Sequence, residues 1–83
     1  MMSEPTGPIS LRRCDPSRNM ARFYELALQP TLFNEIALVR IWGRIGTHGR
    51  SKCETFADAM TAEAARNRVL HRKRQRGYAA VAR

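Results

Sequence analysis

The chain has 83 residues, which is enough for one domain and excludes an enzyme built from two lobes. A domain this short has little interior for a deep substrate cavity, so a surface function is favoured over an internal active site. Fifteen Lys and Arg residues against seven Asp and Glu give a net charge of +8, nearly all of the excess being arginine, and this charge predicts an anionic partner.

The N-terminal segment is expected to be a tail. Residues 1–9 offer few side chains that could pack, so we predict a disordered tail there and a single domain over residues 10–83. A short strand is predicted from Ile9 to Asp15, ended by a turn-forming Asp-Pro-Ser run. No secretory signal and no apolar stretch long enough to span a membrane are visible, so we expect a cytoplasmic protein that enters no membrane.

Three further strands are predicted in the middle of the chain. Residues Asn19 to Gln29 are dense in apolar and aromatic residues and are followed by Pro30, which favours a strand over the alternative of a helix. A second strand is predicted from Ile36 to Ile45. The glycines of the segment Gly46 to Gly49 permit a tight turn, so a hairpin is indicated, with its return strand from Arg50 to Phe56.

The strand from Ile36 to Ile45 has two chemically different faces, because successive side chains of a strand point to opposite sides. The face predicted to form the core holds Ala37, Val39, Ile41 and Ile45. The other face begins with Ile36 and Leu38 and continues with Arg40, Trp42 and Arg44. We expect this second half to be a basic surface with an indole in its middle. The alternative is that Trp42 belongs to the core, since tryptophan is usually largely buried.

A helix is predicted after Asp58, whose carboxylate can accept hydrogen bonds from the free amides of a first helical turn. Small apolar residues recur at helical spacing, which lets the helix lie close to a sheet, and Gly77 is suited to end it. The basic last turns suit the negative end of the helix dipole. The residues after Tyr78 are candidates for a short edge strand.

The reactive side chains do not suggest catalysis. Cys14 and Cys53 lie far apart with no His at ligand spacing, so we expect no metal site and no disulfide, and interpret both as small buried hydrophobes. His48 and His71 have no evident nucleophile or paired carboxylate with which to carry out acid–base chemistry. The sequence therefore predicts a protein that is not an enzyme and needs no cofactor.

The positive charge is concentrated in two segments. Residues Arg40 to Lys52 hold four basic residues and no acid, and residues Asp58 to Arg76 hold six basic and two acidic residues. Phosphate is the commonest macromolecular ligand of such a surface, and an indole beside it could stack on a base or sugar. The alternative is that the arginines only keep the domain solvated.

The segment Trp42-Gly43-Arg44-Ile45-Gly46, followed by Thr47 and Gly49, resembles the signature of the WGR domain, a module also found beside the catalytic domain of poly(ADP-ribose) polymerases. Two other segments look like motifs of that family. Asn19 with the run Phe23 to Leu26 is similar to its Asn-Lys-Phe-Tyr-Glu-Leu strand, and Lys73 to Tyr78 is similar to its Lys-x-x-x-Gly-Tyr ending. The resemblance covers most of the chain.

The resemblance implies an α+β fold in which one C-terminal α-helix packs across a small antiparallel β-sheet. It also implies recognition of DNA ends or breaks. The family's tryptophan stacks against a sugar near a break, while an asparagine, an arginine and a tyrosine approach the 5′ phosphate and the backbone. By position, these roles would pass to Trp42, Asn19, Arg44 and Tyr78.

We therefore predict a nucleic-acid-binding module that contacts backbone phosphate and sugar with little sequence specificity, with DNA favoured over RNA. The predicted contact residues are Asn19, Arg40, Trp42, Arg44, Arg50, Lys52, Lys73 and Tyr78. The alternative function is a protein-interaction module, in which Trp42 and the arginines meet the acidic surface of a partner protein. The oligomeric state is left open, since the edge strands of a small sheet can pair between chains.

Overall fold

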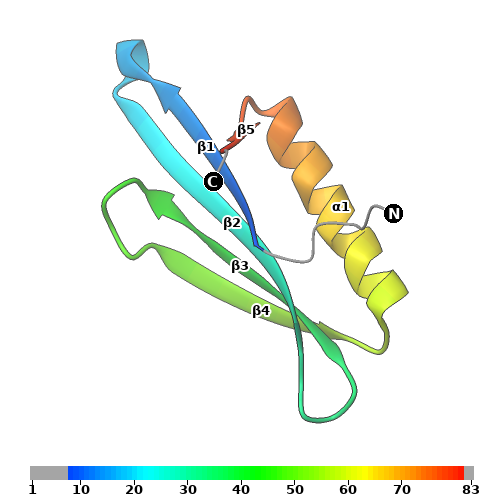
Figure 1. Ribbon diagram of the computed structural model, residues 1–83. Helices are drawn as coiled ribbons and strands as arrows, with labels where there is room; N and C mark the ends of the chain where they lie inside the picture. Colours follow the sequence, from blue (N-terminus) through cyan, green and yellow to red (C-terminus); the bar gives the residue numbers. More distant parts are fainter. Residues whose placement is uncertain (1–7, 82–83) are drawn as a thin grey trace.

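The computed structural model describes residues 8–81, which form one five-stranded antiparallel sheet with a single helix across one face (Figure 1). The elements in chain order are β1 (Ile9–Asp15), the short 3-10 helix η1 (Pro16–Arg18), β2 (Met20–Pro30), β3 (Ile36–Arg44), β4 (Arg50–Phe56), α1 (Ala59–Gln75) and β5 (Ala79–Ala80). The strand order is β4-β3-β2-β1-β5, and every neighbouring pair is antiparallel. The expected α+β fold is confirmed.

The predicted strands match the observed ones closely. β1 and β4 have the predicted bounds, β2 is a strand rather than a helix, and the β3–β4 hairpin is present. Asn19, predicted to begin β2, instead takes a φ of 52° between η1 and β2, a left-handed conformation that asparagine tolerates. Of the tail expected over residues 1–9, residues 1–7 lie outside the described residues, and Ile9 begins β1.

The β3–β4 turn depends on glycine at two positions. Gly46 has a φ of 98° and Gly49 a φ of 74°. A Cβ on Gly49 would collide with the carbonyl oxygen of Trp42 and would lie 2.9 Å from the ring of Phe23. The turn is closed by Thr47, whose amide and hydroxyl both donate to the carbonyl of Arg44, at 3.0 and 2.8 Å. Gly49 therefore packs directly against the backbone of Trp42, the residue that carries the indole.

The hydrophobic core lies between α1 and one face of the sheet. The sheet contributes Leu11, Tyr24, Leu26 and Leu38, and the helix contributes Ala65 and Val69. The small side chains on the buried stripe of α1 bring the helix close to the strands, as the alanine spacing predicted.

The prediction of which face of β3 forms the core was wrong. Leu38 is sealed under α1 on the face that also carries Arg40 and Trp42, because these alternate residues project from the same side. The other face carries Ala37, which is buried, and Val39 and Ile41, which are only partly buried. Apolar residues occupy both faces of this strand, so alternation alone cannot decide which one the helix covers. The core and the basic surface consequently share one face.

The prediction that both cysteines are buried was also wrong, since Cys14 and Cys53 are exposed. Cys53 lies opposite Val39, and Cys14 lies opposite Ala21, in the sheet register. Both side chains therefore belong to the face turned away from α1.

The ends of α1 are capped as the sequence predicts. The carboxylate of Asp58 accepts from the hydroxyl and the amide of Thr61, at 2.6 and 2.8 Å, and these hydrogen bonds hold the pKa of Asp58 below its usual value. At the other end Gly77, with a φ of 97°, donates to the carbonyl of Arg74, and Tyr78 donates to that of Lys73. This pair of bonds is a Schellman motif, and it sets Tyr78 beside Lys73.

We predict that Gly49→Ala destabilises the domain more than Gly46→Ala does. A Cβ on Gly46 meets nothing within 4 Å, so that substitution should cost only the left-handed strain of ~1–2 kcal/mol. At Gly49 the collision with Trp42 should add a further ~1–3 kcal/mol. Urea unfolding of the two variants measures the difference, and equal costs would show that the close approach of Gly49 is unimportant.

Candidate nucleic-acid interface

A hollow of about 420 Å³ lies beside Trp42, where the C-terminal end of α1 meets β2 and β3. Among the described residues that line it, three are basic, four are aromatic and none is acidic. We call it the tryptophan hollow, and its lining consists of Arg22, Phe23, Tyr24, Trp42, Gly43, Arg44, Lys73 and Tyr78.

The register between β2 and β3 builds this hollow. Tyr24 pairs with Trp42, and Arg22 pairs with Arg44, so all four side chains project from the same face. The rings of Tyr24 and Trp42 stack with their centroids 5.9 Å apart and their planes 19° from parallel. Tyr24 is buried in the core, whereas Trp42 is half-buried. The stack therefore fixes the plane of an indole that still reaches the surface.

Lys73 enters the hollow from the last turn of α1. Its Nζ lies 4.4 Å from the ring centroid of Tyr24 and 5.4 Å from that of Tyr78, within the range of cation–π contacts. Tyr78 also meets the ring of Tyr24 edge-on, with centroids 6.3 Å apart. Burial lowers the pKa of Lys73, and the nearby positive charges of Arg76, Arg40, Arg72 and Arg22 lower it further.

Asn19 and Arg44 meet at the rim of the hollow. The guanidinium of Arg44 donates from Nη1 to the carbonyl oxygen of Asn19, at 3.3 Å, and from Nη2 to its side-chain Oδ1, at 3.4 Å. Both residues are exposed. The left-handed turn at Asn19 thus brings together two residues that are 25 positions apart in the chain.

A smaller hollow of about 150 Å³ opens on the other side of Lys73. We call it the arginine hollow, and its lining consists of Tyr24, Arg40, Val69, Arg72, Lys73 and Arg76. Because Tyr24 and Lys73 line both hollows, the two lie next to each other along the end of α1.

The structure gathers most of the residues predicted from the sequence. Trp42, Arg44, Lys73 and Tyr78 line the tryptophan hollow, Asn19 is bonded to Arg44 at its rim, and Arg40 lines the arginine hollow. The two remaining predicted residues lie away from both hollows. Arg50 and Lys52 are exposed on β4, opposite Trp42 and Arg40 in the register, and extend the basic surface along the edge of the sheet.

The two hollows also contain three arginines and one tyrosine that were not predicted as contacts from the sequence: Arg22, Tyr24, Arg72 and Arg76. These four residues form two pairs, and the spacing within each pair indicates that its two side chains lie on one face. Arg22 and Tyr24 are two residues apart and so share a strand face, and Arg72 and Arg76 are four residues apart and so share a helix face. Their convergence on Trp42 and Arg40 requires the tertiary structure.

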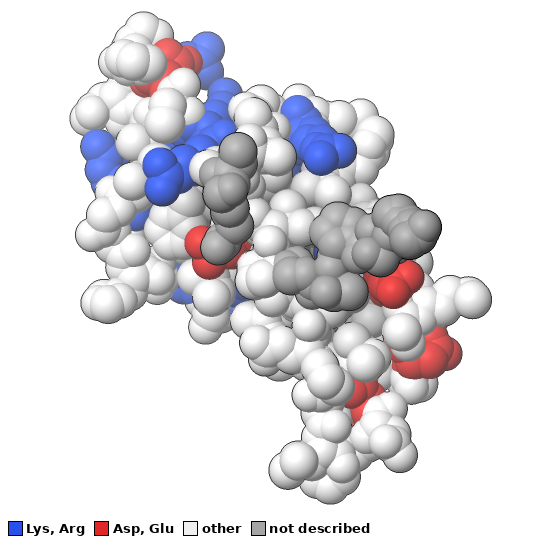
Figure 2. Space-filling model, in the orientation of Figure 1, with Lys and Arg blue, Asp and Glu red and all other residues white. Residues whose placement is uncertain are grey.

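Basic and acidic residues are unevenly distributed between the two ends of the molecule. In Figure 2, Lys and Arg gather over the upper half of the molecule, and most of the visible Asp and Glu lie over the lower half. Four acidic residues belong to the β2–β3 loop, the end of β4 and the start of α1, away from the tryptophan hollow: Glu35, Glu54, Asp58 and Glu63. Asp15 is an exception, since it lies at the basic end beside Arg18. A polyanion is therefore attracted more strongly to the end that carries the tryptophan hollow.

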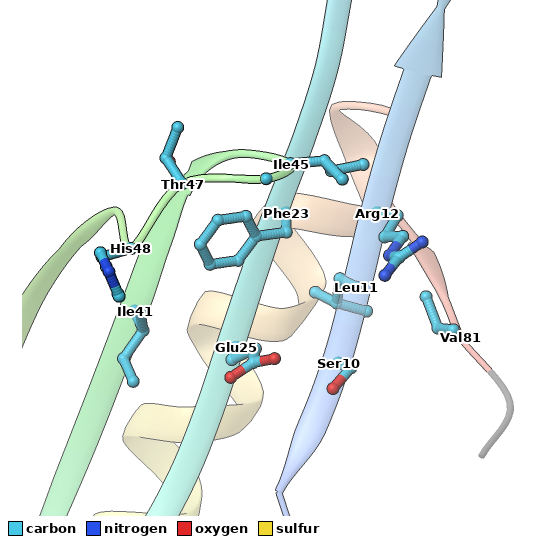
Figure 3. A pocket seen from close by; sticks show the side chains of 11 residues that line it. Ser10, Leu11, Arg12, Phe23, Glu25, Ile41, Ile45, Thr47, His48 and Val81 are labelled. Carbon is cyan, nitrogen blue, oxygen red and sulfur yellow. The ribbon is translucent and has the colours of Figure 1, made fainter.

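A third hollow, of about 560 Å³, lies on the sheet face turned away from α1. Figure 3 shows Phe23, Glu25 and Ile41 projecting from β2 and β3 there, with α1 behind the sheet. Its lining mixes apolar side chains with basic Arg12 and acidic Glu25, and it includes none of the contact residues predicted from the sequence. It lacks the uniformly positive character of the other two hollows.

Two further findings concern residues 8–81 as a whole. No helix within that range has the length and apolar character needed to cross a membrane. No group of three or more His, Cys, Asp or Glu side chains is assembled there in a way that could hold a metal ion.

Comparison with known proteins gives one family and one curated relative. The family model of the WGR domain matches residues 8–83. The chain is 44% identical over 78 residues to "Uncharacterized protein y4dW" of Sinorhizobium fredii (strain NBRC 101917 / NGR234), and the alignment covers 94% of this chain and 38% of that protein. The chain thus spans less than half of the relative's length. No solved structure matches the chain.

We predict that Arg76→Gln raises the pKa of Lys73 toward its usual value, because one of the positive charges that repel the protonated amine is removed. Burial remains, so the recovery should be partial. An NMR titration of the Lys73 side chain measures the pKa. Arg74→Gln is the matched control, since Arg74 lies in the same turn but lines neither hollow, and an equal rise in that variant would contradict this account.

Proposed function

The chain belongs to the WGR domain family, whose members are in general nucleic-acid-binding modules, and we propose that it binds nucleic acid through the tryptophan hollow. The observation that carries this proposal is a half-buried indole, held by a ring stack, in a hollow whose described lining has three cations and no acid. Cations and rings suit the binding of a polyanion rather than acid–base catalysis.

The side chains around the hollow divide into two roles. The exposed part of Trp42 offers a flat apolar surface to a sugar or an unstacked base. Arg44 offers a planar fork of donors for phosphate oxygens, and Arg22 and Lys73 add positive charge beside it. Asn19 and Tyr78 supply amide and hydroxyl donors at the rim and wall. Contacts to phosphate and sugar do not read bases directly, so binding has little sequence specificity.

We further propose that the ligand is a DNA end or a nick. At an end the terminal sugar is free to meet the indole, and a 5′ phosphate monoester carries more negative charge than a backbone diester at neutral pH. Arg50 and Lys52, on the neighbouring strand β4, extend the same basic face and would contact phosphates further from the end.

Binding should fall steeply with salt concentration. Each phosphate contact on duplex DNA contributes about −0.9 to the slope of log affinity against log salt, so four to six contacts should give a slope of roughly −4 to −5. Fluorescence anisotropy with labelled oligonucleotides measures this slope. The same experiment should show tighter binding to a nicked, 5′-phosphorylated duplex than to an intact one.

Two outcomes would limit the proposal. Equal affinity for blunt, nicked and circular DNA would remove the preference for ends and leave nucleic-acid binding in place. If no DNA or RNA shifts the amide spectrum at low salt, the tryptophan hollow does not bind nucleic acid, and a partner protein becomes its candidate ligand.

We predict that Trp42→Leu and Arg44→Gln each weaken binding while the fold is kept. Loss of the stacking surface should cost ~1–3 kcal/mol of binding free energy, and loss of the guanidinium should also reduce the salt slope by about 1. Arg68→Gln is the matched control for charge, because Arg68 is exposed on α1 and lines neither hollow. If the control weakens binding as much as Arg44→Gln, the arginines act only through overall charge.

A further inference from the structure

We propose that the arginine hollow is a second anion site, in which Arg40, Arg72 and Arg76 hold one phosphate group apart from the tryptophan hollow. The chemistry recognised is that of a tetrahedral phosphate. We assign its source to the backbone of the bound nucleic acid, and this assignment alone rests on the proposed function.

The first observation is the state of Arg40. This residue lies in the middle of β3, on the face that α1 covers, between Leu26 and Lys52 in the register. Its Nε is buried and donates to no acceptor among residues 8–81. A buried donor without an acceptor is costly, and charged donors more so, which is why nearly all such groups in proteins are paired. The fold thus presents a donor whose acceptor has to come from outside it.

The second observation is the concentration of like charge opposite Arg40. Arg72 and Arg76 are one turn apart on α1 and face the hollow together with Lys73. No acidic residue is present in the described lining. Besides burial, the charges of Arg76, Arg40 and Arg72 lower the pKa of Lys73, so each of these arginines lies close enough to Lys73 for the two charges to repel. An anion in the hollow would turn this mutual repulsion into attraction.

The third observation is the shape of the site. The hollow measures about 150 Å³, several times the ~30 Å³ that one water molecule occupies in the liquid. Arg40 is half-buried, whereas Arg72 and Arg76 are exposed, so an ion can enter from solvent past two flexible side chains. The planar guanidinium presents paired donors that match two oxygens of an oxyanion, which favours phosphate over chloride. A tetrahedral phosphate also has further oxygens for the other two arginines, which a carboxylate lacks.

The position of the site links it to the proposed function. Lys73 and Tyr24 line both hollows, so a strand whose sugar lies against Trp42 continues past Lys73 toward Arg40 and Arg76. The second site therefore extends the contact along the end of α1 and would add one phosphate to those held by Arg44.

Arg40→Leu tests the site without nucleic acid. Removing a charged side chain whose buried Nε has no acceptor should raise the Tm of the free domain in low-salt buffer without phosphate, whereas removing a structural contact would lower it. Inorganic phosphate should raise the Tm of the unsubstituted domain more than sodium chloride of equal ionic strength does, and this extra rise should vanish in Arg40→Leu. A lower Tm in the variant, or an equal phosphate effect in both proteins, would overturn the proposal.

Arg76→Gln tests the source of the phosphate, with Arg74→Gln as its control in the same turn. Arg76→Gln should weaken binding to a nicked, 5′-phosphorylated duplex about tenfold, as expected for one charge-assisted hydrogen bond, and reduce the salt slope by about 1. Arg74→Gln should change both far less. Equal losses in the two variants would overturn the assignment to backbone phosphate.

The two experiments separate the site from the proposed function. If the unsubstituted domain binds no nucleic acid but phosphate still raises its Tm through Arg40, the proposed function fails and the anion site stands. If the domain binds nucleic acid but phosphate and chloride act alike on its Tm, the anion site fails and the proposed function stands.

Discussion

The pairing register between β2 and β3 is the constraint on which the rest of this structure depends. It sets Tyr24 against Trp42, Arg22 against Arg44 and Leu26 against Arg40, all on the face that α1 covers. A slip of one residue would turn every one of these side chains of one strand to the opposite face. The core, the ring stack and the basic surface would then be separated, so a single hydrogen-bonding pattern maintains both stability and the candidate interface.

The core and the interface are continuous because α1 and the turn that ends it meet the sheet beside Trp42. Tyr24 packs in the core and also lines both hollows. The Schellman motif at Gly77 holds Tyr78 next to Lys73, and the amine of Lys73 lies near both tyrosine rings. The rings offset part of the cost of partly burying this amine, while the surrounding arginines add to it. Such an arrangement sacrifices some stability, as is expected of a site proposed to bind an anion.

The positive charge is distributed unevenly over the surface of the domain. Basic residues line the two hollows, and most of the visible acidic residues lie toward the other half of the molecule, so an approaching polyanion is drawn toward the hollows. The face turned away from α1 has a different chemistry, with Glu25 among apolar side chains. The two faces of one thin sheet thus differ in chemistry, because each is built from alternate residues of the same strands.

The sequence by itself determined the local features of this protein. The strands, the glycine turn, the Asp58 cap and the Gly77 ending were all predicted, because each depends on backbone geometry or on neighbours a few residues away. The WGR resemblance also pointed to Trp42, Arg44, Lys73 and Tyr78, which the structure gathers in one hollow. Only the tertiary structure decided which face of β3 is the core, because apolar residues line both faces and the packing of α1 selects one. The same packing brought Arg40 together with Arg72 and Arg76, and it left Arg50 and Lys52 outside the hollows. The distances between residues of the helix and residues of the sheet depend on how the helix crosses the sheet, and spacing along the chain does not set them.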